Sequence, residues 1–166
     1  MRADDIVRVA YAKNRAALGR PSLSVLPEPA NPVAFQLESD PATVTLITRR
    51  LRVRADLASG KVSFLDFQGQ PILAERERSM EPAQVQGEQT FHVRQQWQSV
   101  PGESLYGLGQ NQLGLLDVRG HDLDLWQSNS VIYIPFLTAD HARRLVRLLE
   151  RGLAGRRAQR RSGRPF

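Results

Sequence analysis

The amino-acid sequence predicts an all-β fold, an antiparallel β-sandwich followed by a basic tail, and three observations support this. Short runs rich in β-branched and aromatic residues recur along the chain, several with alternating apolar and polar positions. Glycines, prolines and polar clusters separate these runs about every 8–12 residues, a spacing typical of sandwiches and barrels. No internal repeat or low-complexity segment interrupts the series before residue 140.

The first part of the chain contains four candidate strands. They are residues 6–11, 33–37, 43–47 and 51–55. Residues 6–11 alternate only in part, whereas the last two runs are rich in β-branched residues and could join into one long strand through Thr48. Four prolines between residues 21 and 32 break any regular element there, so this stretch is expected to be a loop or an edge.

The middle of the chain predicts two successive hairpins. Residues 62–67 alternate again, and Gly60 before them supplies the positive φ that a tight hairpin needs. Gly69 has the same position before a short run at residues 71–74. The remaining candidate strands are residues 91–97, 125–126 and 131–136.

Composition and charge limit the class of protein. The chain has 166 residues, 24% charged and 41% hydrophobic, which fits one globular domain with a real core. It has no cysteine, which excludes disulfides and thiolate metal sites. The first residues carry acids and no apolar run, so no export signal and no membrane span is expected, and a cytoplasmic location is predicted.

The net charge of +6 belongs to the tail. Residues 141–166 contain nine arginines and one acid, a charge of +8, whereas residues 1–140 contain 14 basic and 16 acidic residues, a charge of −2. We therefore divide the chain into a sandwich domain at residues 1–140 and an arginine-rich tail at residues 141–166. No nucleic-acid or membrane partner is expected for the domain itself.

The most informative motif lies at residues 103–136, where glycine pairs, a polar segment and an Ile-Pro-Phe run follow one another. It resembles the signature of the amino-terminal domain of glycoside hydrolase family 31, the retaining α-glucosidases and α-xylosidases. The matching positions are Glu103, Leu105, Tyr106, Gly107, Gly109, Gln110, Gly114, Leu116, Arg119, Gly120, Gln127, Asn129, Ile134, Pro135 and Phe136. A weaker resemblance extends back through the strands around Gly60 and Gly69.

The resemblance implies a galactose-mutarotase-like β-sandwich without a catalytic residue of its own. In this family the catalytic carboxylates lie in a later (β/α)8 barrel, so the chain alone is expected to be inactive and to need no cofactor or metal. It would pack on that barrel and contribute a loop to the sugar pocket of an α-glucosidase or α-xylosidase, and its motif is closer to the α-xylosidase branch.

The candidate substrate-binding residues are Trp126, Gln127 and Asn129. Sugar recognition needs amides or carboxylates for paired hydroxyl groups and an aromatic face for the apolar C–H surface, and this segment offers both. By resemblance, a loop here reaches over the barrel. The alternative is that Gln127 and Asn129 hold the loop through backbone hydrogen bonds, while Trp126 belongs to the core.

Other polar groups in this region are weaker candidates. Asp117, Asp122 and Asp124 are more typical of solvated loop acids than of a catalytic pair, and Arg119 is expected to pair with an acid such as Asp117. The three histidines lie too far apart in sequence for a metal site. The Tyr-Gly-Leu-Gly run at residues 106–109 lacks the Gly-Lys-Ser/Thr of a phosphate loop, so its glycines are expected to permit a tight bend.

The tail departs from the family pattern, and two hypotheses remain open for it. One is that residues 141–166 are read out of frame, which would leave the sandwich incomplete. The other is a genuine basic tail, in which Leu145, Leu148 and Leu149 form a short amphipathic helix. Two alternative functions follow: a standalone carbohydrate-binding module, or a basic-tailed protein that binds nucleic acid or a membrane.

Overall fold

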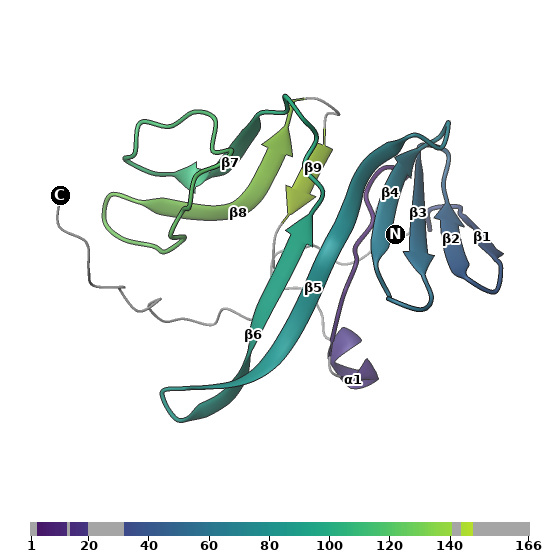
Figure 1. Ribbon diagram of the computed structural model, residues 1–166, viewed down its shortest axis with the longest axis horizontal. Coiled ribbons are helices and arrows are strands. Elements are labelled where there is room, and N and C mark those ends of the chain that lie inside the picture. The colour runs from purple at the N-terminus through teal and green to yellow at the C-terminus, as the bar shows by residue number, and fades with distance from the viewer. Residues whose placement is uncertain (1–2, 13, 20–31, 141–143, 148–166) are drawn as a thin grey trace. The chain divides into compact units, whose positions relative to one another are not determined.

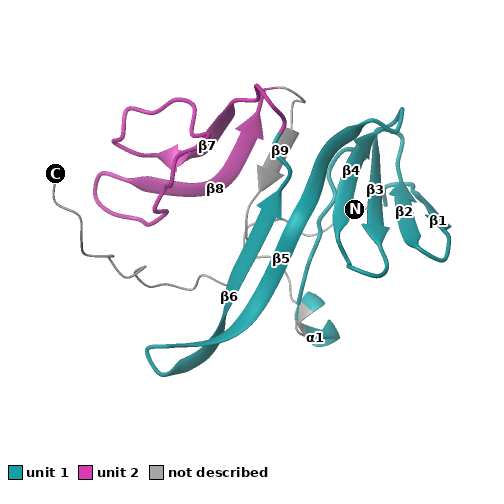
Figure 2. Ribbon diagram, in the orientation of Figure 1, with its two compact units in different colours: residues 1–99 teal, residues 100–166 magenta. Residues whose placement is uncertain are grey.

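The computed structural model describes residues 3–12, 14–19, 32–140 and 144–147, which contain one short helix and nine strands (Figure 1). The chain divides into two units, residues 1–99 and residues 100–166, coloured teal and magenta in Figure 2. Among the described residues, no helix is long and apolar enough to cross a membrane. The two units are described in turn.

The first unit contains a six-stranded antiparallel sheet in which neighbours in sequence are neighbours in space. Its strands are β1 (Gln36–Ser39), β2 (Thr43–Ile47), β3 (Leu51–Asp56), β4 (Val62–Asp66), β5 (Pro71–Val85) and β6 (Glu88–Trp97). The predicted hairpins at Gly60 and Gly69 are confirmed, and both glycines have positive φ, +68° and +85°. The sheet is therefore a meander of consecutive hairpins.

Short polar side chains close the first four turns of this meander. Asp40, Asp56 and Asp66 each accept main-chain N–H groups of the turn that follows them, at 2.7–2.9 Å. Thr48 Oγ1 accepts the N–H of Leu51 at 2.9 Å in the same way. The prediction that residues 43–55 could form one strand through Thr48 is wrong, because this hydroxyl stabilises a turn and folds β3 back on β2.

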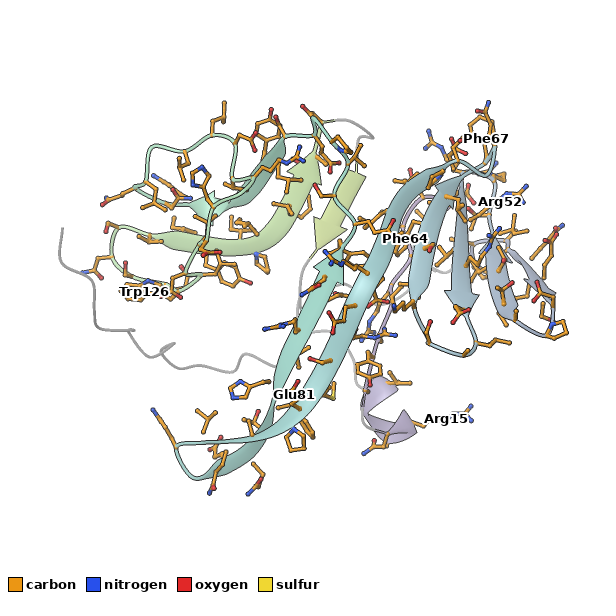
Figure 3. The ribbon with its side chains drawn as sticks, viewed as in Figure 1. Arg15, Arg52, Phe64, Phe67, Glu81 and Trp126 are labelled. Atoms are coloured by element: carbon orange, nitrogen blue, oxygen red, sulfur yellow. The ribbon has the colours of Figure 1, made fainter. Side chains whose placement is uncertain are left out.

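The best-packed part of this unit lies on β3 and β4. Leu51, Val53, Val62 and Leu65 are buried, with exposed fractions of 7–9%. Val53 lies opposite Phe64, whose ring centroid is 6.2 Å from that of Trp97 on β6. Figure 3 labels Phe64 where β4 lies beside β5. Aromatic packing thus links the middle of the sheet to its last strand.

The β5–β6 hairpin is much longer than the predicted runs at residues 71–74 and 91–97. It pairs Glu75 with Trp97 and Val85 with Glu88, and turns at Gln86 and Gly87, which have φ of +52° and +86°. Two consecutive residues of positive φ are typical of a type I′ hairpin turn. The extension of β5 beyond residue 74 was not predicted, because the segment that follows is charged and does not alternate between apolar and polar residues.

A buried carboxylate fixes the base of this hairpin. The Glu75 side chain is fully buried and accepts hydrogen bonds from the N–H of Val62 at 3.1 Å and from Gln95 Nε2 at 3.0 Å. Arg78 Nε lies 3.5 Å from the Glu75 carboxylate, and Arg78 Nη2 donates to the carbonyl of Gly60 at 2.6 Å. Glu75 therefore connects three strands at the register shift between Glu75 and Glu77.

The amino-terminal segment does not form the predicted strand at residues 6–11. The described part makes one isolated bridge between Ala3 and Ile6, and Ile6 and Tyr11 are more than half exposed. The segment attaches through its acids instead, because Asp4 pairs with Arg49 and Asp5 pairs with Arg50. Incomplete alternation in a short run was therefore a poor predictor of sheet pairing. The short helix α1 (Arg15–Leu18) follows.

The second unit contains a three-stranded antiparallel sheet of β7 (Leu105–Gln110), β8 (Ile132–Ala139) and β9 (Arg144–Arg147). The predicted strand at residues 131–136 is present as β8, whereas residues 125–126 lie in a loop. Residues 144–147 are extended and pair with β8, unlike the short helix that one of the two open hypotheses placed in the tail. The rest of the predicted tail lies outside the described residues.

The Gly107–Gly109 segment belongs to strand β7 rather than to a turn after it. The register shifts between Gly107 and Gly109, and Leu108 between them has φ of +66°. A Cβ atom on Gly107 would lie 2.4 Å from the carbonyl oxygen of Phe136, and one on Gly109 would lie 2.0 Å from that of Ile132. These glycines therefore let β7 bulge while its backbone stays against β8.

Candidate functional site

The loop between β7 and β8, residues 111–131, contains every candidate binding residue, and Asp117 fixes its middle. The carboxylate of Asp117 accepts the main-chain N–H groups of Leu105 and Arg119, each at 2.9 Å. The N–H of Val118 donates to the carbonyl of Leu105 at 2.8 Å, and Val118 is only 7% exposed. Residues 117–119 therefore attach the loop to the start of β7.

These hydrogen bonds also determine the ionisation of Asp117. Donation from the N–H groups of Leu105 and Arg119, together with the Ser104 hydroxyl, lowers the pKa of this carboxyl below its ordinary value of 3.8. An acid held in its ionised form by main-chain amides cannot supply a proton near neutral pH. Asp117 is therefore a structural carboxylate, and general acid catalysis is not a role that its surroundings support.

Arg119 completes this first attachment point. Its guanidinium donates a hydrogen bond to the main-chain carbonyl of Glu103, a residue that is only 4% exposed. Arg119 also interacts with Asp117, whose carboxylate accepts the main-chain N–H of Arg119 and whose pKa the charge of Arg119 helps to lower. Both side chains thus hold the loop by binding main-chain groups.

Gln127 provides a second attachment point at the end of the loop. Its side-chain oxygen accepts the main-chain N–H of Tyr133 in β8 at 3.3 Å. β7 pairs with Tyr133 through Gly109, and β9 pairs with β8 only from Phe136 onward, so the Gln127 amide adds a loop contact near this end of β8. Main-chain hydrogen bonds between Ser128 and Val131, at 3.1 and 3.4 Å, close a tight turn next to it.

Trp126 and Asn129 lie beside these anchors and are exposed. Trp126 keeps 55% of its surface accessible, and Figure 3 shows it in the loop beside β8. Asn129 is exposed at the tip of the turn between Ser128 and Val131. The alternative in which Trp126 belongs to the core is therefore wrong for this unit, while the alternative in which Gln127 holds the loop agrees with its hydrogen bond.

The predicted trio is brought together in one short segment, but its members have different surroundings. Trp126 and Asn129 present an aromatic face and an amide to solvent, whereas the amide oxygen of Gln127 is already engaged. Sugar contact by these residues remains a prediction. Asp122 and Asp124 are exposed on the same loop, and no group of three metal-ligating side chains occurs within the described residues.

Sequence reasoning missed the role of Asp117, which it classed with the solvated loop acids. A local signal was available, because aspartates commonly accept the N–H two residues later, and Arg119-Gly120 follows Asp117 at that distance. The second partner, Leu105, lies 12 residues earlier in the chain. That contact depends on the tertiary fold, so no local pattern predicts it.

Comparison with known families identifies the domain. Residues 1–135 match the model of the glycosyl hydrolase 31 N-terminal galactose mutarotase-like domain. The chain belongs to this family. The match confirms the predicted fold class, a galactose-mutarotase-like antiparallel β-sandwich, and the resemblance on which that prediction rested.

Two α-xylosidases are similar to this family 31 domain in sequence. An α-xylosidase of Saccharolobus solfataricus is 31% identical over 147 residues, which cover 82% of this chain and 20% of that protein. An α-xylosidase of family 31 from Xanthomonas citri, known from a crystal structure, is 36% identical with a TM-score of 0.66. That match covers 72% of this chain and 13% of the other. The chain thus spans a fifth or less of these relatives.

More distant family 31 structures share the fold. An α-xylosidase from a soil metagenome, solved with xylose, has a TM-score of 0.54 at 22% identity over 72% of this chain and 19% of its own. A dextranase of Flavobacterium johnsoniae, solved with isomaltotriose, has a TM-score of 0.51 at 20% identity over 72% of this chain and 15% of its own. The same fold thus occurs in enzymes that differ in their named activities.

Proposed function

We propose that this chain is the non-catalytic amino-terminal domain of a retaining α-glycosidase of the α-xylosidase type. It packs on a catalytic (β/α)8 barrel, and its loop of residues 111–131 forms part of the wall of the sugar pocket. In the retaining mechanism one carboxylate attacks the sugar and a second carboxyl group acts as acid and then base, and both belong to the barrel. The role of this domain is to shape the sugar pocket and to orient the substrate in it.

The exposed ring of Trp126 is the observation that supports this proposal best. An indole that is 55% accessible, in a loop attached at Asp117 and Gln127, offers a flat apolar face at a defined place. Sugars present apolar C–H faces to such rings, and a pentose without a hydroxymethyl group can lie flat on one. The identity to two α-xylosidases, 31% and 36%, favours an α-xyloside over an α-glucoside as the substrate.

A domain exchange tests the proposal. Residues 1–135 of this chain replace the corresponding domain of the Saccharolobus solfataricus α-xylosidase, and hydrolysis of p-nitrophenyl α-xyloside is measured. The chimera is expected to keep activity, and Trp126→Ala within it is expected to raise KM with a smaller change in kcat, since the ring contributes to binding. A folded chimera without activity would count against a shared role of the domain.

The isolated chain provides a complementary test. The purified 166-residue protein is expected to hydrolyse neither aryl α-xylosides nor aryl α-glucosides, because both catalytic carboxylates of this mechanism lie in the barrel. Turnover that follows the protein through purification and disappears on substitution of Asp122 or Asp124 would contradict the assignment of a non-catalytic domain.

A further inference from the structure

We infer that Asp117 and Gln127 are positioning residues that hold Trp126 in one orientation, and that Gln127 itself does not contact the sugar. This inference rests on the proposed function, in which Trp126 is the sugar-contacting group. It changes the assignment of Gln127 from ligand contact to support. The ligand class is a sugar with an apolar C–H face, of which an α-xyloside is the simplest example.

Several hydrogen bonds hold the first attachment point. Residues 117–119 make three hydrogen bonds to main-chain groups outside the segment: one accepted by Asp117 from Leu105, one donated by the N–H of Val118 to Leu105 and one donated by the Arg119 guanidinium to Glu103. A fourth, from the N–H of Arg119 to Asp117, lies within the segment. The Val118 side chain between Asp117 and Arg119 is buried. A loop segment held this way has few alternative conformations, because moving it breaks several bonds together.

Gln127 directly follows Trp126 in the chain. The Gln127 side chain bonds to Tyr133 in β8, so the residue next to the indole is fixed to a strand. The Ser128–Val131 turn fixes the backbone on the same side. The eight residues from Arg119 to Trp126 are thus attached at both ends, which lowers the conformational entropy that a bound sugar would have to remove.

Gln127, Trp126 and Asn129 differ in what a sugar contact would cost. The Gln127 amide oxygen accepts a main-chain N–H, so a sugar that drew this side chain away from β8 would break that bond. The Trp126 ring and the Asn129 amide are exposed and available. A recognition surface of one aromatic face and one amide is sufficient to orient a pentose.

The experiment uses the full chain labelled with 5-fluorotryptophan, which carries two reporters because the sequence has two tryptophans, Trp97 and Trp126. Trp126→Phe assigns the two ¹⁹F resonances. The unsubstituted protein is expected to give one narrow Trp126 line. Methyl α-xyloside at high concentration is expected to shift this line slightly, because the domain forms only part of the wall of the sugar pocket. The Trp97 line reports folding of the first unit in every variant.

Matched variants separate positioning from contact. Gln127→Ala is expected to broaden or split the Trp126 line and to weaken binding of methyl α-xyloside roughly 5- to 10-fold, since preorganisation is lost. Gln127→Glu keeps the accepting oxygen and is expected to restore both properties. Asp117→Ala is expected to act like Gln127→Ala, and the conservative Asp117→Asn to act more weakly. Asp122→Asn, an exposed acid on the same loop, is expected to leave the line unchanged.

The possible outcomes are distinguishable. An unchanged Trp126 line in both Gln127→Ala and Asp117→Ala would overturn the inference. So would a Gln127→Glu variant that binds as poorly as Gln127→Ala while its Trp126 line stays narrow, since Gln127 would then be a contact. If methyl α-xyloside shifts no line in any protein, the proposed sugar contact fails, and the line shapes alone still decide whether the two residues position Trp126.

Discussion

The α-carbon of Gly109 lies so close to the backbone of Ile132 that an added Cβ would be 2.0 Å from the Ile132 carbonyl oxygen. No side chain fits in that space, and the neighbouring N–H of Ile134, at 2.8 Å, prevents a simple shift. The close approach of β7 and β8 at this point is what brings the ends of the 111–131 loop together. Gly109 therefore supports the candidate site without belonging to it.

We predict that Gly109→Ala prevents stable pairing of β7 and β8. Its φ of +101° is unfavourable for alanine, at a cost of about 1–2 kcal/mol, and the steric overlap with Ile132 adds to this. Gly114→Ala is the control, since Gly114 also has positive φ, +69°, but no atom within 4 Å of the added carbon. Hydrogen exchange of the β8 amides should be fast in the first variant only. Equal protection in both would contradict the steric argument.

A second prediction concerns the buried carboxylate of Glu75. Glu75→Ala removes the acceptor of the Val62 N–H and of Gln95 Nε2, and the carboxylate beside Arg78, so the free energy of unfolding should fall by about 3 kcal/mol. Glu75→Gln keeps an accepting oxygen for Val62 and should cost less. Glu81→Ala, which removes an exposed acid from the same strand, is the control. Urea unfolding followed by circular dichroism gives all three values.

Local sequence predicted the short hairpins well, because their information is local. Gly60 and Gly69 supply the positive φ of their turns. The β-branched run before Gly60 forms β3, and the alternating run after it forms β4. The Thr48 turn was missed, although its cause is also local. The Thr48 hydroxyl accepts the N–H of Leu51, and such a bond does not change the pattern of apolar and polar residues. A pattern of apolar residues indicates which face of a strand is buried, but it does not indicate where a turn lies.

The candidate site was predicted in composition but not in geometry. The segment containing Trp126, Gln127 and Asn129 was found from residue types and from the family motif. In the structure Trp126 is exposed, whereas Gln127 accepts the N–H of Tyr133. Asp117 in the same loop accepts the N–H of Leu105. Such pairings of loop with strand depend on the folded sheet, so no periodicity or propensity in the sequence encodes them.

The pKa of Asp117 gives a prediction about acid stability. Its folded-state pKa is lowered below 3.8 by the N–H groups of Leu105 and Arg119, so the unfolded chain binds this proton more readily than the folded chain. The resulting stabilisation is complete above the unfolded pKa, about 3.9, and is lost as pH falls through the folded pKa. Asp117→Asn should therefore reduce the stability difference between pH 5 and more acidic solution, with thermal unfolding as the measurement.

Two other acids contribute to the loss of stability at low pH, so Asp117→Asn removes only part of it. The pKa values of Asp40 and Asp56 are also lowered, first by the hydroxyls of Thr43 and Ser59 and then by turn amides. The Asp117→Asn protein should thus keep part of the acid dependence. A pH profile identical to that of the unsubstituted protein would show that Asp117 makes no linked contribution.

The last prediction is a stabilising change at the tip of the β5–β6 hairpin. Gln86 has φ of +52°, a left-handed conformation that glutamine adopts at a cost, whereas asparagine tolerates it and is preferred before glycine in type I′ turns. Gln86→Asn should raise the free energy of unfolding by roughly 0.5 kcal/mol, the scale of a local turn preference. Gln84→Asn, placed in the strand and opposite Gln89, is the matched control and should be neutral or destabilising because asparagine is a poor strand residue. If both changes had the same effect on the urea midpoint, the turn conformation at Gln86 would not be the cause.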